Sequence, residues 1–457
     1  MWSRIAIITA LLVSLLVINN RRNWDHGIPS FDAFGYYNYL PATIIYNDVV
    51  TYSFFPPLYE KYKFGGSEPD RPYGNHKLDN GNQIDKYPMG LAIAELPLFL
   101  IAHAWCKITG AAPADGYATP YALAVILTYP VLLFIGLAIT RRLLLRYYSD
   151  GVTAITLMLL FFSTNLYHYT AFDQGMSHPL SFTLFAAFIY LTDSWYRSPH
   201  RWHLYLMGLL LGWIIITRPV NGLIIILPIL WQTGSISDLK AKGTLLIRNA
   251  APVAIAGLLC IAVCSLQMAY WYKTSGRLIT YSYEGEHFFF LKPKIWKGLF
   301  SFRKGWFIYT PVALVGMAGL WHLRKMYSRL VPAIVVFYVL MIYVVFSWGM
   351  WWYGGSFGCR PLIETLALLS LPLAAFLDWL SRKGKPARIT GTVVLCFFIA
   401  LNMFQSYQYS RIAIHWDRMT FQAWCKSFGK VEMNYDEYEK YLIDGDTYWK
   451  ERAEISR

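Results

Sequence analysis

The sequence predicts an all-α polytopic membrane protein with about eleven transmembrane helices. Of its 457 residues, 56% are hydrophobic and 18% are aromatic, whereas only 15% are charged. This composition is too apolar for a soluble protein of this length. The net charge of +14 comes mostly from short basic clusters between apolar runs, a pattern typical of membrane topology and not of nucleic-acid binding. The six cysteines lack the paired spacing of zinc sites or disulfides, and we interpret them as packing residues.

The expected spans are apolar runs that approach the length of about twenty residues needed to cross the hydrocarbon core. The first run, 2–19, has the basic start and apolar core of a signal peptide, but no small-residue cleavage site follows it before Arg21 and Arg22. We interpret it as an uncleaved span with a cytoplasmic N-terminus. The other runs, of which the fourth and fifth are short, are 121–140, 152–166, 180–195, 204–217, 220–231, 250–271, 307–323, 330–348, 362–380 and 389–407.

One further apolar run, 89–108, carries Glu95, Pro97 and His103, and we interpret it as an interfacial helix along the membrane surface. With this run excluded, the basic clusters between the spans fall on one side, which the positive-inside rule identifies as the cytoplasm. These clusters are 141–146, 197–201, 240–248, 324–329 and 382–388.

The chain is therefore expected to form a transmembrane domain, 1–409, followed by a polar extracytoplasmic tail, 410–457. The first extracytoplasmic loop, 21–118, is long and carries the interfacial helices, and a later one is 272–306. Shorter outer loops are expected at 167–179 and 349–361. The tail mixes tyrosine with acidic and basic residues, a composition compatible with a small amphipathic cap or with disorder.

The stretch that directly follows the first span places one carboxylate, Asp32, among aromatic residues at the expected membrane surface. Rings such as those of Tyr36 and Tyr37 can lie at headgroup level, so these residues are candidate supports for the acid. An acid beside a lipid interface suits a substrate that is partly lipid. Asp32 is therefore our candidate catalytic base, and the alternative is an ordinary solvated aspartate near a helix end.

Several basic residues lie on the outer side, where Lys and Arg are normally scarce. Arg303 and Lys304 belong to a strip in which cations alternate with aromatic residues just before a span. Arg218 and Arg360 each lie in a turn with glycine and proline, where backbone N–H groups and a helix start can meet an anion. Lys86 lies near the start of the interfacial helix. All five are candidate ligands of a lipid phosphate, with headgroup anchoring or a tight connection between spans as the alternatives.

His168, Asp173 and His178 share the second outer loop, where they could face the candidate base. They are candidates for holding an acceptor or a divalent metal ion, the one candidate cofactor, and a structural role is the alternative. Glu364 lies one turn into a span, where a carboxylate is costly unless it is paired, and we expect Arg360 to be its partner. Three further candidate acceptor contacts are Glu284, Glu286 and His287. No P-loop occurs, so ATP-driven chemistry has no support.

This layout resembles the GT-C superfamily of polytopic glycosyltransferases, which includes protein O-mannosyltransferases and the lipid A aminoarabinose transferases. The resemblance covers most of the chain as an arrangement of spans and loops, and it adds short motifs. Asp32 matches an early catalytic acid, and Asp173 matches a second acid on an outer loop. Lys86, followed by Pro88, is similar to the Lys-Pro start of the interfacial helix in those enzymes.

Two other stretches carry the same resemblance. Residues 217–219, Thr-Arg-Pro, fall where members of the superfamily often have Thr before Lys or Arg, and the Trp- and Gly-rich loop before Arg360 is similar to a loop of bacterial members. The chain departs from two subfamilies: Ala33 stands where O-mannosyltransferases have Glu, and the Trp-Trp-Asp motif of oligosaccharyltransferases does not occur.

The resemblance implies a membrane glycosyltransferase that moves a sugar from a polyprenyl-phosphate donor to an acceptor hydroxyl at the extracytoplasmic face of a bacterial inner membrane. Asp32 would be the general base of an inverting transfer, and the five cations would bind the lipid phosphate. The implied partners are the donor lipid, a lipid, glycan or protein acceptor, and membrane lipids, without nucleic acid. A ligase for lipid-linked glycans, a flippase or transporter, and a non-catalytic scaffold are the alternatives.

Overall fold

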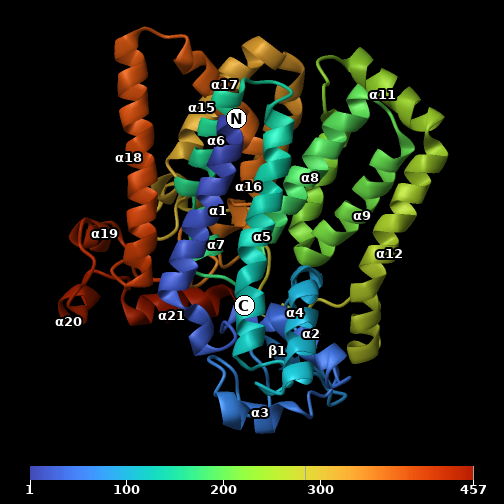
Figure 1. The fold of residues 1–457 in the computed structure, drawn as a ribbon, viewed down its shortest axis with the longest axis vertical. Helices are drawn as coiled ribbons and strands as arrows, with labels where there is room; N and C mark the ends of the chain where they lie inside the picture. The colour runs from blue at the N-terminus through green and yellow to red at the C-terminus, as the bar shows by residue number, and fades with distance from the viewer. Residues whose placement is uncertain (284, 456–457) are drawn as a thin grey trace.

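The computed structural model describes residues 1–283 and 285–455, and over these residues the protein is mostly helical. Long helices form a bundle whose members run roughly along the long axis of the molecule (Figure 1), with the N-terminus at one end. These helices are α1 Trp2–Arg21, α5 Thr119–Leu144, α6 Asp150–Phe162, α8 His178–Arg197, α9 Arg201–Thr217, α12 Ala250–Ser275, α15 Val312–Tyr327, α16 Val331–Ser347, α17 Leu366–Ser381 and α18 Lys385–Ser410.

The elements of the first outer loop gather at the opposite end of the bundle, which we call the loop end, and the short helices of the tail lie beside the bundle toward the same end (Figure 1). They are η1 Asn23–His26, α2 Asp32–Ile44, α3 Phe55–Tyr62, β1 Asn75–Lys77, β2 Gln83–Asp85, α4 Gly90–Thr109, α19 Phe421–Ser427, α20 Tyr435–Glu439 and α21 Gly445–Ile455. The remaining short elements are α7 Asn165–Ala171, η2 Pro219–Ile225, α10 Ile226–Leu230, α11 Ile236–Arg248, α13 Ile295–Phe300, α14 Trp306–Tyr309, η3 Ser328–Leu330 and η4 Arg360–Leu362.

Six helical segments among the described residues are long and apolar enough to cross a membrane. They are Trp2–Arg21, Gly90–Thr109, Thr119–Leu144, Ala250–Ser275, Val312–Ser347 and Lys385–Ser410. A seventh is added if α6 and α7, which meet at a bend of 65°, form one broken span. The chain is thus an all-α membrane protein, as the sequence predicts. The expected count of about eleven spans is not reached by this measure and stays a prediction.

Two segments differ from the regular spans that the sequence predicts. The run 220–231 forms the 3-10 helix η2 followed by the short α10, within which Pro228 lacks a backbone donor. The run 89–108, expected along the membrane surface, corresponds to α4 and meets the length and composition of a span. Helix α4 packs against α2, α5 and α9, and its interfacial placement stays a prediction.

Helices α15 and α16 belong to one apolar segment of 36 residues but are separate helices. Tyr327, the last residue of α15, has φ −141° and ψ 60°, which interrupts the helical geometry. An unbroken helix of this length would measure about 54 Å, well beyond the thickness of a bilayer core. The division agrees with the two runs expected at 307–323 and 330–348.

The core of the bundle is centred on α17, most of whose residues are buried and which packs against α15, α6 and α8. In contrast, only 11% of the most apolar part of α12, and the same share of α18, is buried within the protein. Their outward side chains, such as Leu258 and Val393, are aliphatic. An exposed aliphatic surface of this extent is typical of helix faces that contact lipid.

The first outer loop has an aromatic core of its own at the loop end. Phe34 of α2 packs on Phe64, with ring centroids 4.7 Å apart, and on Phe55 and Tyr117 at 6.1 and 6.0 Å. The antiparallel pair β1 and β2 and the helices α3 and α4 surround this core. Because α2 is fixed along its length by these rings, the direction of its first residue, Asp32, is fixed as well.

The described part of the tail is an ordered cap of short helices, which decides between the two alternatives that its composition leaves open. Ile414, Met419, Tyr438 and Leu442 pack together and against two residues of the bundle, Tyr309 and Phe357. Ile455 of α21 packs on Trp351 and Trp352. The tail therefore covers the loop between α16 and α17, which carries Arg360.

Candidate active site

Asp32 opens α2 at the loop end and forms an ion pair with Arg360, which lies 328 positions further along the chain. Arg360 Nη2 donates to Asp32 Oδ2 at 2.8 Å, and Tyr87 Oη donates to Asp32 Oδ1 at 2.6 Å. Burial alone would raise the pKa of Asp32, but Arg360, Tyr87 and Lys86 together hold this pKa below its ordinary value. Asp32 is thus an ionised carboxylate at the positive end of a helix dipole.

The hydroxyl of Tyr87 reaches Asp32 because its ring is held between two glycines. A Cβ atom added to Gly35 would lie 2.3 Å from the Tyr87 ring, and one added to Gly74 would lie 2.7 Å from it. Gly74 also has φ +90°, a conformation that favours glycine. Tyr87 could not be selected from the sequence, since Gly35 and Gly74 are not its neighbours in the chain and its local signal is the Lys-Tyr-Pro sequence in which it stands.

Arg360 projects from the glycine-rich loop between α16 and α17. Gly354 and Gly358, with φ +62° and +58°, allow the loop to turn. Residues 354–358 also match the Gly-x-Ser-x-Gly pattern of serine hydrolases. Here, however, Ser356 is buried and its hydroxyl is directed at the backbone carbonyls of the two glycines. Ser356 is therefore not placed to act as a nucleophile.

The expected pair of Arg360 and Glu364 is wrong. The segment from Arg360 is a 3-10 turn, and α17 begins only beyond Glu364, so a spacing of four residues does not place the two side chains on one helical face. Glu364, which is fully buried, lies 3.1 Å from His178 Nδ1 and 3.5 Å from Arg218 Nε. Asn221 Nδ2 donates to it at 3.2 Å. Glu364 thus orients Arg218 at the end of α9, while Arg360 is left to pair with the candidate base.

Lys86 forms an ion pair with Glu286 in the loop that follows α12. Its ammonium group lies 4.9 Å from the ring centroid of Tyr283, and Ser282 Oγ donates to its backbone carbonyl at 2.8 Å. These contacts fold the later outer loop over the start of α4. Glu286 therefore has a structural partner, and Glu284, another candidate acceptor contact, lies outside the described residues.

Asp173 lies in the turn after α7, on the rim of the same site. Its side chain is exposed, but the protein packed around it raises its pKa to about 6, with Arg360 opposing this rise and Asp32 adding to it. In the same turn Gly175, with φ +102°, approaches Ala33 so closely that an added Cβ atom would lie 2.2 Å from the Ala33 Cβ. This contact requires a small residue at position 33, where O-mannosyltransferases have Glu.

The two tyrosines expected to support Asp32 point in different directions. The ring of Tyr36 lies 4.8 Å from that of Tyr87, and Ser177 Oγ donates to the Tyr36 hydroxyl at 3.3 Å. The hydroxyl of Tyr37 instead donates to the Gly116 carbonyl, within the aromatic core of the first loop. Tyr36 is therefore part of the site, and Tyr37 is part of its scaffold.

The predicted group of His168, Asp173 and His178 is not assembled as a cluster. The His168 ring is buried parallel to Phe172 at 5.7 Å and lies 4.8 Å from Phe357, whereas His178 is buried against Glu364. Within residues 1–283 and 285–455, no group of three or more His, Cys, Asp or Glu side chains could hold a metal ion. The residues proposed from the sequence as ligands of a divalent metal therefore do not form a metal site.

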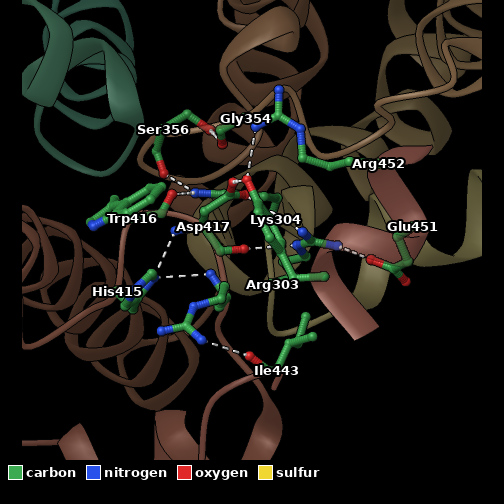
Figure 2. Close-up of polar contacts among 12 residues, drawn as sticks. Arg303, Lys304, Gly354, Ser356, His415, Trp416, Asp417, Ile443, Glu451 and Arg452 are labelled. Atoms are coloured by element: carbon green, nitrogen blue, oxygen red, sulfur yellow. Dashed lines mark hydrogen bonds and ion pairs between the residues drawn. The ribbon is translucent and has the colours of Figure 1, made fainter. Parts of the chain in front are cut away.

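Arg303 and Lys304 bind the tail (Figure 2), which corrects the expectation that they face a lipid phosphate. Both side chains are buried. Arg303 Nη1 donates to Glu451 Oε2 at 2.7 Å, and Lys304 Nζ donates to the Trp416 carbonyl at 2.5 Å. Burial lowers the pKa of Lys304 to about 7, with Arg303 adding to this effect. Cations that alternate with aromatic residues are compatible both with a phosphate site and with a buried contact inside the protein. Only the position of the tail shows that Arg303 and Lys304 form a buried contact.

A cavity of about 220 Å³ opens beside Tyr87, on the side of the first outer loop. It is lined by the rings of Tyr73 and Tyr87 and by polar side chains that include Arg71, Asn75 and Lys86. A few convergent polar groups beside aromatic surface are typical of sites that bind small polar ligands.

In comparisons with known proteins, no family model matches the chain and no curated protein matches it. The loop end brings together an ionised acid, Asp32, and the cations Arg360, Arg218 and Lys86, which come from separate segments of the chain. Such an arrangement can accept a proton and bind an anion at neighbouring positions.

Proposed function

We propose that this protein is a membrane glycosyltransferase that moves a sugar from a polyprenyl-phosphate donor to an acceptor hydroxyl. The observation that carries the proposal is the ion pair of Asp32 and Arg360, with Lys86 and Arg218 close by, at one end of a bundle with lipid-facing helices. A base beside several cations suits a reaction in which an acceptor loses a proton while negative charge grows on a phosphate.

In the proposed reaction Asp32 takes the proton of the acceptor hydroxyl as the acceptor oxygen attacks the anomeric carbon. The bond from this carbon to the phosphate oxygen breaks, and polyprenyl phosphate leaves with the electron pair. A single displacement of this kind inverts the anomeric centre. Arg360, Arg218 and Lys86 accelerate the step because they bind the charge of the leaving phosphate more strongly in the transition state than in the ground state.

Arg360 would change partner during this cycle. While it pairs with Arg360, Asp32 is a weak base, because its pKa is held below the ordinary value. A phosphate presents several anionic oxygens to the guanidinium fork and competes with the carboxylate for it. As Arg360 turns toward the phosphate, the pKa of Asp32 rises and the carboxylate becomes a better proton acceptor. Tyr87 keeps the carboxylate oriented throughout.

The acceptor would enter from the cavity beside Tyr87. The residues that line this cavity belong to the first outer loop, and none of them belongs to α12 or α18. Its rings and polar side chains suit a sugar or another hydroxyl-bearing ligand. Asp173, on the rim of the site with a pKa of about 6, is placed to contact a polar acceptor as it binds.

We place the reaction at the extracytoplasmic face of a bacterial inner membrane, with a cytoplasmic N-terminus and eleven spans in the regions that the sequence analysis gives. Two features of Figure 1 support this orientation. The first outer loop and the tail lie at the end of the bundle opposite the N-terminus. Helix α11, which carries Lys240, Lys242 and Arg248, lies toward the N-terminal end, where the positive-inside rule expects basic residues.

The proposal can be tested with the full chain in lipid nanodiscs, supplied with a panel of polyprenyl-phosphate sugars and candidate acceptors. We expect release of polyprenyl phosphate from one class of donor, stimulated by one class of acceptor, with an inverted glycosidic bond in the product. A flippase or transporter would move the donor across the bilayer without releasing phosphate. A ligase would act only on glycans linked to lipid pyrophosphate. Either of these results would replace the proposal.

A further inference from the structure

We propose that the C-terminal tail, residues 411–455, is a positioning part of the site, and that Lys304 transmits its effect by holding the loop that carries Arg360. The inference rests on the proposed function, since it assigns the tail a role in placing Arg360 for transfer. It is carried by a series of contacts that run from the tail through Lys304 to the Arg360 loop (Figure 2).

Lys304 joins the tail directly to the Arg360 loop. Its buried ammonium group donates to two backbone carbonyls, that of Ser356 in the loop and that of Trp416 in the tail. The same two residues are also bonded to each other, because the Ser356 N–H donates to the Trp416 carbonyl at 3.1 Å. One buried cation therefore fixes the separation of two segments of backbone, only a few residues before Arg360.

Arg303, the neighbour of Lys304, holds the same part of the tail in place. Its guanidinium carbon lies 3.7 Å from the ring centroid of Trp352, and its Nε donates to the Asp417 carbonyl at 2.8 Å. The Asp417 carboxylate accepts a bond of 2.6 Å from Tyr448 of α21, and Glu451 of α21 accepts from Arg303 at 2.7 Å. The end of the tail is thus bound to the residue that precedes Lys304.

The Arg360 loop is held on its other side by α7. Tyr169 Oη accepts from the Phe357 N–H at 2.8 Å, and Asn165 Nδ2 donates to the Phe357 carbonyl at 3.1 Å. The loop therefore lies between α7, which leads to the Asp173 turn, and the tail. If the tail side is released, the loop still has its contacts with α7 but loses those that hold Ser356 from the other side.

The chemistry of these contacts favours positioning over simple stabilisation. Burying a cation costs several kcal/mol in solvation, and well-packed apolar residues can often replace buried charges without loss of stability. The tail already has an apolar core around Tyr438. The buried Arg303 and Lys304 add direction to this contact, since their hydrogen bonds to the loop and the tail depend on distance and angle, as apolar contacts do not.

The test uses the full chain in a background in which Cys359, the buried neighbour of Arg360, is the only cysteine. The variant Lys304→Met removes the ammonium group and keeps the length of the side chain, Lys304→Arg keeps the charge, and Lys292→Met is the control, since Lys292 is exposed in the same outer loop. In Lys304→Met we expect maleimide labelling of Cys359 to become at least about tenfold faster and kcat to fall about tenfold, with the KM for the acceptor unchanged. Lys304→Arg should bring the labelling rate and kcat part of the way back to the wild-type values, and Lys292→Met should change neither the labelling rate nor kcat.

Unchanged labelling and kcat in Lys304→Met would overturn the proposal, and so would faster labelling with full kcat, because the loop would then move without consequence for transfer. If Lys304→Met does not fold, Glu451→Gln provides the same comparison, because the Glu451 side chain is partly exposed and lies at the far end of the contact. A wild-type protein that transfers no sugar would remove the proposed function, whereas the labelling rates would still report whether the tail holds the loop.

Discussion

Tyr87 Oη donates a hydrogen bond of 2.6 Å to one oxygen of Asp32, and Arg360 donates to the other oxygen. The two bonds together hold the plane of the carboxylate in one orientation. Both carboxylate oxygens have a donor, but each oxygen has a second lone pair. An acceptor hydroxyl can therefore reach Asp32 only from the directions that Tyr87 and Arg360 leave open. This geometry gives the carboxylate an orientation before any substrate binds, and it makes the following outcomes measurable.

Replacing Asp32 by asparagine should abolish transfer without unfolding the protein. The amide keeps the shape of the side chain but cannot take the acceptor proton, and proton transfer by a placed base contributes about a hundredfold or more. The measurement is sugar transfer in nanodiscs, with elution on gel filtration as the check of folding. Asp79→Asn is the matched control, because Asp79 is an exposed acid of the same loop. Retention of more than about a tenth of the wild-type rate in Asp32→Asn would remove Asp32 from the role of base.

Removing only the Tyr87 hydroxyl should make Asp32 more basic and less ordered. In Tyr87→Phe the ionised carboxylate loses a hydrogen bond that lowers its pKa, and a bond to a charged group is worth about 1.5–3 kcal/mol. The acidic limb of the pH–rate profile should therefore move to higher pH by about one unit or more. Tyr46→Phe removes a comparable hydroxyl, bonded to the Asp115 carbonyl in the same loop, and should leave the profile in place.

Arg360→Lys should weaken transfer although the charge is kept. A lysine ammonium is a point charge without the fork that lets a guanidinium contact a carboxylate and a phosphate together. We expect kcat to fall about tenfold to a hundredfold, with Arg360→Gln lower still. The measurement is the rate of transfer at saturating donor. The control is Arg382→Lys. Arg382 is an exposed arginine just after the end of α17, and it pairs with Asp378 of that helix. Full activity of Arg360→Lys would exclude bidentate phosphate binding by this residue.

Glu364→Gln should lower the stability of the protein and weaken its donor binding. The change leaves Arg218 without its buried carboxylate partner, and breaking a buried ion pair on one side costs about 3–5 kcal/mol. Adding Arg218→Gln should recover part of the stability but none of the donor affinity. Thermal unfolding and donor binding, measured over the full double-mutant cycle, separate the two effects. Additive stability losses would show that the two side chains do not interact.

Asp85 should give the first outer loop a stability that falls as the pH rises. Asp85 is fully buried in β2, and burial raises its pKa well above the ordinary value. The folded protein then keeps a proton that the unfolded chain loses above about pH 4, so the free energy of unfolding decreases from that pH upward toward the raised pKa. Asp85→Asn does not titrate, and thermal unfolding should show it to be more stable than the wild type at pH 8 and equal to it near about pH 4.

A second acid of the same loop provides the control for the sign of this effect. Asp48 is surrounded by protein that raises its pKa, but its hydrogen bonds from Thr51 and Ser53 prevail, and the net shift is downward. A lowered pKa contributes stability that is present above about pH 4 and is lost as the pH falls. Asp48→Asn should therefore be less stable than the wild type at pH 8. If Asp85→Asn, like Asp48→Asn, were less stable than the wild type at pH 8, the raised pKa of Asp85 would be contradicted.

The helical character, the apolar segments and the candidate residues Asp32, Lys86, Arg218 and Arg360 could be predicted from the sequence. Lys86, Arg218 and Arg360 are cations on the outer side, where Lys and Arg are uncommon, and Asp32 is one carboxylate in an aromatic stretch, so each is visible without coordinates. Their partners were not visible. Arg360 meets Asp32 and not its near neighbour Glu364, because a 3-10 turn replaces the helix that a spacing of four residues assumes.

The same rule selected Arg303 and Lys304, whose carboxylate and carbonyl partners lie in a tail that composition alone does not order. It could not select Tyr87, because a tyrosine in an aromatic-rich chain carries no signal of its own. Gly35 and Gly74, which hold the Tyr87 ring, come from separate parts of the first outer loop. Their shared contact with this ring is visible only in the folded loop. Sequence patterns thus report which side chains are unusual, and tertiary contacts decide what each one meets.

The separation of Asp32 and Arg360 by 328 positions also constrains how the protein is made. At about 5–20 residues per second, a ribosome needs roughly 15 to 65 seconds after releasing Asp32 before Arg360 exists, and longer before the tail emerges. Throughout this time the nascent chain carries Asp32 and its hydrogen-bond donor Tyr87 without Arg360. A product that terminates before Arg360 therefore carries Asp32 without its ion-pair partner, and quality-control proteases meet a chain whose loop end is incomplete.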